Sequence, residues 1–292
     1  MQNKLMAMGA FVLACLLLSA CEKVNVSDEE SQEHGDGIEL VFHVDKFEQV
    51  PFVKDVAVTR DAVPVEQLCT RLNFAVFSNG TKVKSIAQRA GDKDFGTVKV
   101  ELSKGKTFQV VIIAHSGASS ATITSPEKIS FDGKVTDTFY AYQEITVDES
   151  KDYSVELKRA VAMFRLMVED DTPSQIQKLQ FKYTGGSSTF NAVTGHGCVN
   201  SKQTEERTVS QQSKTFEIYT FPHEDTDVLK ITVNAMDPAG NILFTRTFED
   251  VDVKRNMITQ YSGKFYGEIV NPEANSFKFL ADNYWEEKDM KY

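Results

Sequence analysis

The sequence predicts an all-β fold, and three observations lead to this prediction. Apolar and polar residues alternate along several stretches, for example where Val98, Val100 and Leu102 are separated by Lys99 and Glu101. A period of two is typical of β-strands that place one face on a hydrophobic core and the other in water. Turn-forming sequences interrupt these stretches at short intervals, at Asn79-Gly80, Lys104-Gly105, Asp132-Gly133, Gly185-Gly186 and Ala239-Gly240-Asn241. Helical periodicity is almost missing, so the pattern favours an all-β sandwich architecture.

The number of candidate strands indicates two domains. We expect roughly seven strands before Leu157 and roughly six or seven after it, which is too many for one small sandwich. A chain of 292 residues also exceeds one typical domain of about 100–150 residues. We therefore predict two sandwiches in tandem, over residues 38–158 and 159–270. No Gly/Ser-rich or Pro-rich linker separates them, so the joint near Lys158-Arg159 is expected to be tight.

Individual segments refine this prediction. The runs from Phe108 to Ala114 and from Ala160 to Val168 are apolar on both faces, which suits central strands. The second run also contains good helix formers, so propensity alone leaves it open between strand and helix. Apolar runs on both sides of Asn79-Gly80 predict a β-hairpin. A short helix is expected only in the stretch from Pro64 to Leu72.

The N-terminal segment has the pattern of an export signal. Lys4 supplies a positive charge, and an apolar run from Ala10 to Leu18 follows, which is shorter than the ~20 residues of a membrane-spanning helix. The tetrad Leu18-Ser19-Ala20-Cys21 resembles a bacterial lipobox. The resemblance implies that residues 1–20 are a lipoprotein signal peptide, cut between Ala20 and Cys21, and that Cys21 is acylated. An ordinary signal peptide with a chance cysteine is the alternative.

Residues 21–37 are predicted to form a flexible tether, because this polar stretch has too few large apolar residues to bury. Its acidic run, Ser27-Asp28-Glu29-Glu30, resembles the surface-export signal of lipoproteins in the Bacteroidetes.

Charge excludes one class of partner. The chain has a net charge of −10, and since Lys4 is the only charged residue of the signal segment, the mature chain carries −11. No cluster of lysine or arginine offsets this charge, so we predict no nucleic-acid binding. Attachment to a membrane would then depend on the acyl chains, where each buried CH₂ contributes about 0.8 kcal/mol.

Two of the four cysteines, Cys69 and Cys198, lie outside the signal and lipid site. They fall in different predicted domains, so two isolated and partly buried thiols are expected. A disulfide between them remains the alternative, because the compartment outside the inner membrane permits one.

Motifs for catalysis or cofactor binding are missing from the sequence. It contains no Gly-rich phosphate loop and no His-Glu-x-x-His zinc site, and its five histidines are scattered. The stretch Gly195-His196-Gly197-Cys198 is interpreted as a glycine-rich connecting turn rather than a Cys/His nucleophile pair. The paired acids Asp170-Asp171 and Asp250/Asp252 are interpreted as solvated loop residues rather than calcium ligands or glycosidase carboxylates. We therefore predict no enzymatic activity, no cofactor and no metal.

The last segment, residues 271–292, combines apolar and charged residues. It is either a frayed tail or a strand that pairs outside its own domain. Its candidate exchange-strand residues are Phe277, Phe279, Tyr284 and Trp285. Because Phe277 and Phe279 are two apart, a strand would place both on one side.

Two segments resemble a known family. The first segment consists of three nearby stretches, which are Phe139-Tyr140-Ala141, Ile145-Thr146-Val147 and residues 155–162. The second runs from Arg255 to Tyr266 and contains, in this order, an Arg-Asn pair, a threonine and a Ser-Gly pair. In order and spacing they resemble Bacteroidales fimbrial anchor lipoproteins, the FimB-like partners of fimbrillins. This resemblance implies two transthyretin-like, Greek-key β-sandwiches, a lipid anchor on the outer membrane, fimbrillin partners and a place at the base of a fimbrium.

Stalk fimbrillins of the wider superfamily are trimmed after an arginine, which opens a groove for a neighbour's strand, whereas anchors are not expected to need the cut. Arg60, in Thr59-Arg60-Asp61, is a candidate for such processing and leaves anchor and shaft roles both open. The main rival function is a surface glycan-binding lipoprotein of a polysaccharide-uptake system, and a lipid-anchored hydrolase is a weaker third.

Overall fold

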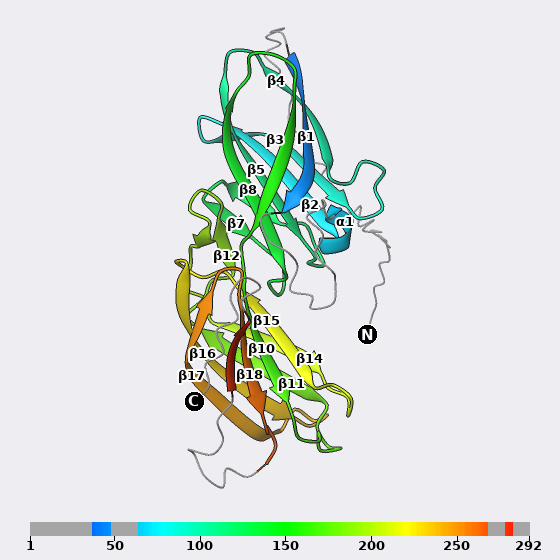
Figure 1. Ribbon diagram of the computed structural model, residues 1–292, viewed down its shortest axis with the longest axis vertical. Helices are drawn as coiled ribbons and strands as arrows, with labels where there is room; N and C mark the ends of the chain where they lie inside the picture. Colours follow the sequence, from blue (N-terminus) through cyan, green and yellow to red (C-terminus); the bar gives the residue numbers. More distant parts are fainter. Residues whose placement is uncertain (1–36, 48–63, 268–277, 283–292) are drawn as a thin grey trace, which may run out of the picture. The chain divides into compact units, whose positions relative to one another are not determined.

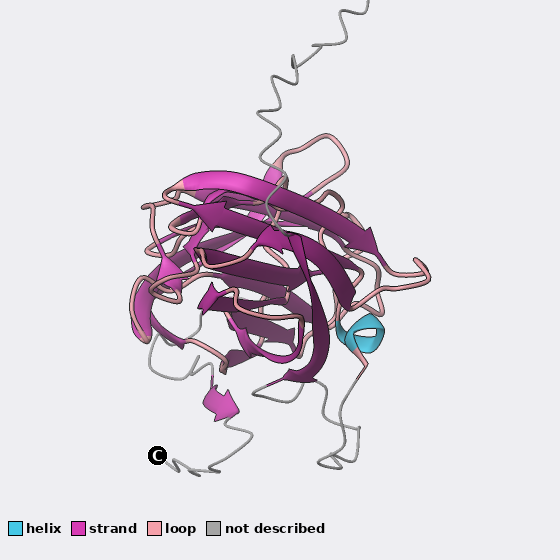
Figure 2. Ribbon diagram, turned by 90° about the horizontal axis from the view of Figure 1, so that it is seen from above, coloured by secondary structure: helices cyan, strands magenta, loops and turns pink. Residues whose placement is uncertain are grey.

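The computed structural model describes residues 37–47, 64–267 and 278–282, the last of these by its backbone alone. Nearly all regular structure in these ranges is β-strand, which confirms the predicted all-β sandwich class (Figure 2). The one described helix, α1 (Val65–Leu68), is shorter than the stretch predicted from Pro64 to Leu72. The strands of the first half are β1 (Gly37–Phe47), β2 (Arg71–Ser78), β3 (Thr81–Arg89), β4 (Thr97–Ser103), β5 (Thr107–His115), β6 (Thr122–Ser125), β7 (Lys128–Ser130), β8 (Thr138–Thr146) and β9 (Lys151–Arg159). Those of the second half are β10 (Ala162–Val168), β11 (Lys178–Thr184), β12 (Thr189–Asn191), β13 (His196–Gly197), β14 (Gln203–Thr208), β15 (Thr215–Thr220), β16 (Thr226–Met236), β17 (Ile242–Lys254), β18 (Ile258–Gly263) and β19 (Lys278–Asp282).

The strands of the first half form one sheet in the order β3-β2-β5-β8-β9-β1-β4 (Figure 1). This sheet folds into two layers between β8 and β9, which pair only at Phe139↔Arg159 and Tyr140↔Lys158. Phe42 of β1 meets Phe74 of β2 with 5.0 Å between ring centroids, although the two strands are not neighbours in the sheet. The hydrophobic core therefore lies between the layer of β3, β2, β5 and β8 and the layer of β9, β1 and β4.

The strands of the second half form two four-stranded sheets. One has the order β15-β10-β18-β19, and the other has the order β14-β11-β16-β17. Aromatic rings meet between the two sheets, since Phe164 of β10 lies 5.6 Å from Phe248 of β17 and Phe181 of β11 lies 6.5 Å from Phe216 of β15. A second hydrophobic cluster fills the space between them, so this half is also a sandwich.

A small fourth sheet, β13-β12-β7-β6, joins strands from the two halves of the sequence. β7 pairs with β12 in antiparallel register at Thr189↔Ser130 and Phe190↔Ile129. A third buried cluster lies around this sheet and also draws on both halves, with Phe77 and Val111 on one side and Phe190 and Phe221 on the other. Sequence analysis did not predict this pairing, because neither strand exceeds three residues.

The link between β9 and β10 is short, in agreement with the tight joint that was predicted near Lys158-Arg159. β9 ends at Arg159 and β10 begins at Ala162. The backbone between them is bonded on both sides, because Ala160 N donates to Thr138 O at 2.8 Å and Asn256 N donates to Val161 O at 2.8 Å. The division into domains at residues 158 and 159 stays a prediction.

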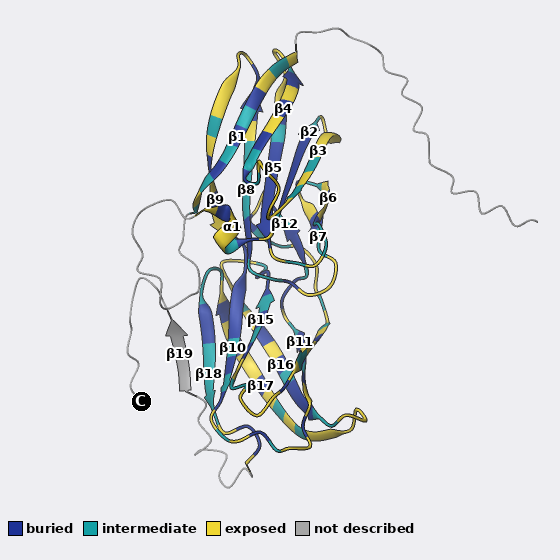
Figure 3. Ribbon diagram, turned by 90° about the vertical axis from the view of Figure 1, so that its right-hand side faces the viewer, coloured by how far each residue is buried: buried dark blue, intermediate teal, exposed yellow. Residues whose placement is uncertain are grey.

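Several single elements match their predictions. β5 lies between β2 and β8, and β10 lies between β15 and β18, so both doubly apolar runs form central strands (Figure 3). β2 and β3 form the predicted hairpin, and Asn79 and Gly80 turn it with φ of 49° and 76°. Left-handed φ values at both positions are what a tight two-residue hairpin turn requires.

Candidate functional site

β1 occupies a slot between two other strands. It pairs antiparallel with β4 from Gly37↔Ser103 to His43↔Thr97, and parallel with β9 from Leu40↔Lys151 to Phe47↔Leu157. Its backbone is therefore hydrogen-bonded on both sides for most of its length. Removal of this one strand would leave β4 without a strand partner in its sheet and would open one edge of β9, and unpaired strands readily pair with another extended chain.

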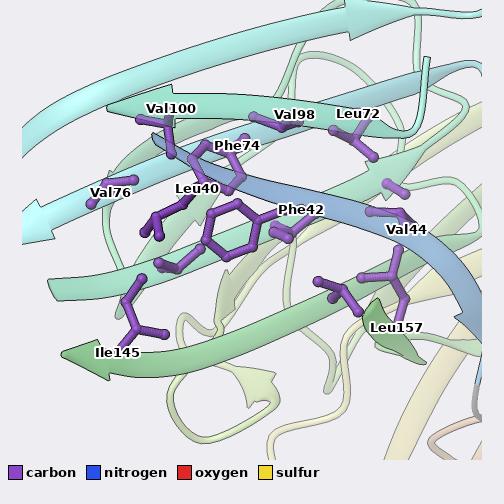
Figure 4. Close-up of a cluster of buried hydrophobic side chains, with 14 of the residues drawn as sticks. Leu40, Phe42, Val44, Leu72, Phe74, Val76, Val98, Val100, Ile145 and Leu157 are labelled. Atoms are coloured by element: carbon purple, nitrogen blue, oxygen red, sulfur yellow. The ribbon is translucent and has the colours of Figure 1, made fainter. Parts of the chain in front are cut away.

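The inner face of β1 is apolar. Leu40, Phe42 and Val44 alternate along it and are 0%, 0% and 5% exposed. Figure 4 shows these three side chains pointing into the cluster of the first sandwich. The ring of Phe42 also stacks on that of Tyr153, with 4.8 Å between centroids. Full burial of one such side chain contributes about 1.5–3 kcal/mol, so the apolar face of β1 contributes strongly to the stability of the first sandwich.

Two side-chain hydrogen bonds hold β1 near its ends. Near the start of β1, Ser150 Oγ donates to Glu39 O at 2.8 Å. Near its end, Ser154 Oγ donates to Asp45 Oδ1 at 2.8 Å, and the pairing with β9 shifts by one residue between Val44 and Lys46. These side-chain contacts fix the register of the strand but are few, because main-chain bonds and apolar packing supply most of its attachment.

The end of β1 lies against α1 and the turn before β4. A cavity of about 380 Å³ is lined there by His43, Val44, Asp45, Pro64, Val65, Glu66, Phe95, Gly96 and Thr97. Gly96 has a φ of 91°, and a Cβ at this position would lie 2.8 Å from Val65 Cγ1. Only glycine therefore allows the close approach in which Val44 N donates to Gly96 O at 2.8 Å.

A second strand is relevant to the predicted exchange segment. β19 pairs antiparallel with β18 from Ile258↔Asp282 to Ser262↔Lys278, and it forms the outer strand of its sheet. Phe279 belongs to β19 and stands opposite Tyr261 in the register. The segment therefore has a partner strand within its own chain. Phe277, Tyr284 and Trp285 lie outside the described residues.

The chain that follows β18 is fixed by Asp170. Its carboxylate accepts three backbone hydrogen bonds, from Phe265 N at 2.8 Å, Tyr266 N at 2.7 Å and Gly267 N at 2.9 Å. Asp171, beside it, is fully exposed and makes only a 3.4 Å contact with Lys214 Nζ. The interpretation of both acids as solvated loop residues is thus wrong for Asp170, which positions the backbone that leads towards the C-terminal segment.

The remaining predicted site residues are placed as follows. Ala20, Cys21 and Arg60 lie outside the described residues, so lipidation, signal cleavage and processing stay predictions. His196 belongs to β13, and the turn that precedes β13 includes Gly195. His196 Nε2 lies 3.4 Å from Asp225 Oδ1, while Cys198 is exposed, and no contact joins the histidine to the thiol in the described structure.

Cys69 and Cys198 are both free thiols, as expected, although Cys69 is fully buried and Cys198 is exposed. Burial raises the pKa of the Cys69 thiol, which keeps it protonated. Within the described ranges no group of three or more His, Cys, Asp or Glu side chains could hold a metal ion. No described helix is both long enough and apolar enough to cross a membrane.

A model of a protein family of unknown function, DUF6562, matches residues 53–275. The chain belongs to this family. No curated protein matches the sequence.

Solved structures with a related fold come from the Bacteroidales. One, from Bacteroides thetaiotaomicron VPI-5482, is provisionally named for polysaccharide binding; it has a TM-score of 0.51 and 10% identity, with 84% of this chain and 96% of that chain covered. The fimbrial anchor protein Mfa2 from Porphyromonas gingivalis has a TM-score of 0.43 and 11% identity, with 84% and 96% covered. A fimbrial assembly protein from Parabacteroides distasonis ATCC 8503 has a TM-score of 0.40 and 11% identity, with 78% and 91% covered. Likeness at such low identity establishes the fold alone.

Proposed function

We propose that this chain is a subunit of a surface fimbrium that is anchored in the outer membrane through lipid at Cys21 and joins fimbrillin neighbours by exchanging β-strands. The resemblance of residues 139–162 and 255–266 to fimbrial anchor lipoproteins supports this function. The role needs no catalytic centre, cofactor or metal. It needs a rigid sandwich with one slot that accepts an extended strand.

The observation that carries the proposal is the position of β1. This strand fills a slot between β4 and β9, and the chain continues from it through residues 48–63 to α1. Arg60 belongs to that connection, so a cut after it would separate β1 covalently from the rest of the fold. A strand from a neighbour could then enter the slot and place alternate side chains where Leu40, Phe42 and Val44 lie.

The donor in this proposal is the C-terminal segment of the neighbouring subunit. β19 supports the assignment, because the same segment takes strand conformation and pairs with β18 in its own chain. Phe277 and Phe279 are spaced by two, which matches the spacing of Leu40 and Phe42. A donor that is hydrogen-bonded on both sides and buried on one face dissociates very slowly, as a permanent fibre requires.

The anchor and shaft roles differ in the fate of β1. A shaft subunit would lose β1 after cleavage at Arg60 and accept a donor strand. An anchor would keep β1 in place and act only as a donor through its own C-terminal segment. The lipid at Cys21 favours the anchor role, because β1 connects the tether to the sandwich and its loss would detach the fold from the membrane.

The test uses chain 22–292 with an arginine-specific protease and a synthetic peptide of residues 271–292. If the subunit is a shaft protein, mass spectrometry will show release of residues 22–60. The peptide will then slow hydrogen exchange in β4 and β9. If it is an anchor, β1 will stay attached, and the peptide will bind the trimmed chain of a fimbrillin partner instead.

A peptide with Phe277→Ser and Phe279→Ser is the matched control. It keeps every backbone hydrogen-bonding group but loses the two apolar side chains, and it should fail to protect the acceptor strands. Equal protection by both peptides, or none by either on any acceptor, would remove strand exchange as the function.

A further inference from the structure

The two layers of the first sandwich have unequal widths. The layer of β3, β2, β5 and β8 has four strands, whereas the layer of β9, β1 and β4 has three. β2 is buried at every position from Leu72 to Phe77, but its neighbour β3 has no buried residue on either face (Figure 3). The narrower layer therefore does not cover β3. A further strand position lies beside β4 and over β3, and no described strand occupies it; we call it the fourth-strand position.

The floor of the fourth-strand position is the inner face of β3. Ile86 and Lys84 stand opposite Phe74 and Val76 of β2, which belong to the core, so all four side chains lie on the inner side of the layer. Ile86 is half-buried against the core, and Lys84 is exposed. The floor thus presents an apolar side chain and a cation two residues apart.

The wall of the fourth-strand position is the free edge of β4. Val44 N donates to Gly96 O at 2.8 Å, and hydrogen-bonded pairs alternate along an antiparallel ladder, so the even-numbered residues of β4 bond β1. The odd-numbered residues direct their backbone groups away from β1. A side chain of β3 already bonds Thr97 O on this side. The N–H and C=O groups of Lys99 and Glu101 have no partner among the described residues, and an extended chain satisfies such groups by pairing with the edge.

The charge around this position favours an acidic segment. β3 carries Lys82, Lys84 and Arg89 and no acid, so its charge of +3 exceeds that of every other described strand. Lys99 of β4 adds a fourth cation, which Glu101 balances. Neither Lys84 nor Lys99 has an ion pair within the described ranges. A strand that alternates apolar and acidic residues along one face would cover the isoleucine of the floor and pair with its lysine.

One segment of this chain has that composition. Residues 22–36 contain six acids and one lysine, a net charge of 1 − 6 = −5. Val24, Val26, Asp28 and Glu30 are spaced by two, so a strand places two apolar and then two acidic side chains on one face. This order matches the floor, where the isoleucine and the lysine are also two residues apart. We propose that residues 22–36 of a neighbouring copy add to the free edge of β4 as the fourth strand of this layer.

This pairing is distinct from the exchange of β1. It uses the opposite edge of β4, leaves β1 in place, and requires neither a cut at Arg60 nor the C-terminal segment. Its consequence is a lateral link between copies. That consequence rests on the proposed lipid anchor, because confinement to one membrane raises the effective concentration of neighbouring copies, but the binding itself does not depend on the anchor.

The test adds a synthetic peptide of residues 22–36 to chain 22–292 and follows single amides by NMR. At saturation the peptide should slow hydrogen exchange of the Lys99 and Glu101 amides by about tenfold or more, because these amides gain a hydrogen-bond partner. Val98 and Val100 already bond β1 and should change little. The same protection should appear without peptide as the protein concentration rises. No protection of Lys99 and Glu101, or protection by a peptide of residues 271–292 instead, would overturn the proposal while leaving the exchange of β1 to its own test.

Substitutions locate the bound segment. Lys84→Glu reverses the charge of the floor and should weaken peptide binding roughly three- to tenfold, as expected for an exposed ion pair turned into a repulsion. Lys182→Glu is the matched control, since Lys182 is an exposed lysine on β11 of the second sandwich. A peptide with Val24→Ser and Val26→Ser keeps its charge and should lose protection. Equal binding by both peptides, or equal weakening by both lysine variants, would indicate unspecific charge attraction and overturn the assignment.

Discussion

Arg159 and Asp137 form a buried two-point ion pair where the two halves of the sequence meet. Arg159 Nε lies 2.8 Å from Asp137 Oδ1, and Nη2 lies 3.0 Å from Oδ2. The third nitrogen, Nη1, donates to Asn256 Oδ1 at 2.8 Å, and the side chain of Arg159 is 1% exposed. One residue at the end of β9 thus joins the residue that precedes β8 to the turn before β18.

We predict that Arg159→Met lowers the free energy of unfolding by about 3–5 kcal/mol, because it leaves the Asp137 carboxylate without its partner. Chemical denaturation with circular dichroism measures this change. Lys158→Met is the control, since Lys158 is exposed and next to Arg159, and it should change stability by no more than about 0.5 kcal/mol. A loss below about 1 kcal/mol for Arg159→Met would contradict the structural role of the pair.

The slot of β1 gives a second prediction. Phe42→Ala should destabilise the fold by about 3–5 kcal/mol, because Phe42 is fully buried between Phe74 and Tyr153. Lys46→Ala, on an exposed position of the same strand, should have an effect of at most about 0.5 kcal/mol. Equal midpoints for both variants in a denaturant titration would show that β1 is not packed in this slot in solution.

The stability of the protein should fall in mild acid because of His115. Gly117 N donates to His115 Nδ1 at 3.0 Å, and the other ring nitrogen, Nε2, bonds Asn73 Oδ1 at 3.2 Å. Because Nδ1 accepts a hydrogen bond, it carries no proton, and the imidazole ring of His115 must be neutral in this arrangement. Burial, together with the nearby Arg71 cation, lowers the pKa of His115 from 6.5 to about 4.

A His whose folded-state pKa is below its unfolded value contributes stability that is complete above pH 6.5. That stability is lost as pH falls towards 4, and its size is about 3 kcal/mol at 1.36 kcal/mol for each pKa unit. Unfolding free energies from pH 7 to pH 4 should therefore decline more steeply for the native chain than for His115→Gln. If the unfolding free energies of the native chain and of His115→Gln decline in parallel from pH 7 to pH 4, His115 is not the cause of the acid sensitivity.

Asp170 provides a fourth prediction. Asp170→Ala removes the acceptor of three backbone N–H groups and should lower stability by about 2–3 kcal/mol. Hydrogen exchange at residues 265–267 should accelerate as well. Asp171→Ala is the matched control, because that side chain is fully exposed, and both measurements should stay close to those of the native chain. If the two variants behave alike, the carboxylate of Asp170 does not hold this turn.

Lipidation can be tested apart from the fold. Cys21→Ala should abolish acyl labelling and move the protein from the membrane fraction to the soluble fraction, because the acidic chain has no basic cluster to hold it at an anionic surface. Cys69→Ala should leave acyl labelling and membrane partition unchanged, since Cys69 is a buried thiol of the first sandwich. Membrane partition that survives Cys21→Ala would exclude the lipid anchor.

The sequence was informative where structure depends on neighbours along the chain. The alternation of Val98, Val100 and Leu102 gave β4 and its buried face, because side chains of a strand alternate whatever their partner. Asn79-Gly80 likewise gave the β2–β3 hairpin, since its turn needs two left-handed residues.

Contacts between distant residues could not be predicted in the same way. Asp170 looked like a loop acid because its three bonding partners lie 95–97 positions further along the chain. Arg159 bonds Asp137 and Asn256, which lie 22 and 97 positions away, and a lone arginine at a strand end gives no sign of such partners.

The parallel pairing of β1 with β9 determines how the subunit would respond to mechanical tension. With the proposed lipid anchor at Cys21, a load from the membrane would enter at Gly37, the first residue of β1. It would pass to the second sandwich through the end of β9, which leads directly into β10. Because the two strands are parallel, these points lie at opposite ends of the pair, and the load pulls the strands past each other. Hydrogen bonds run across the strand direction and must then break together, as in a shear joint, rather than one after another as in a zipper. A surface fibre fastened in this geometry would hold against flow without any additional covalent cross-link.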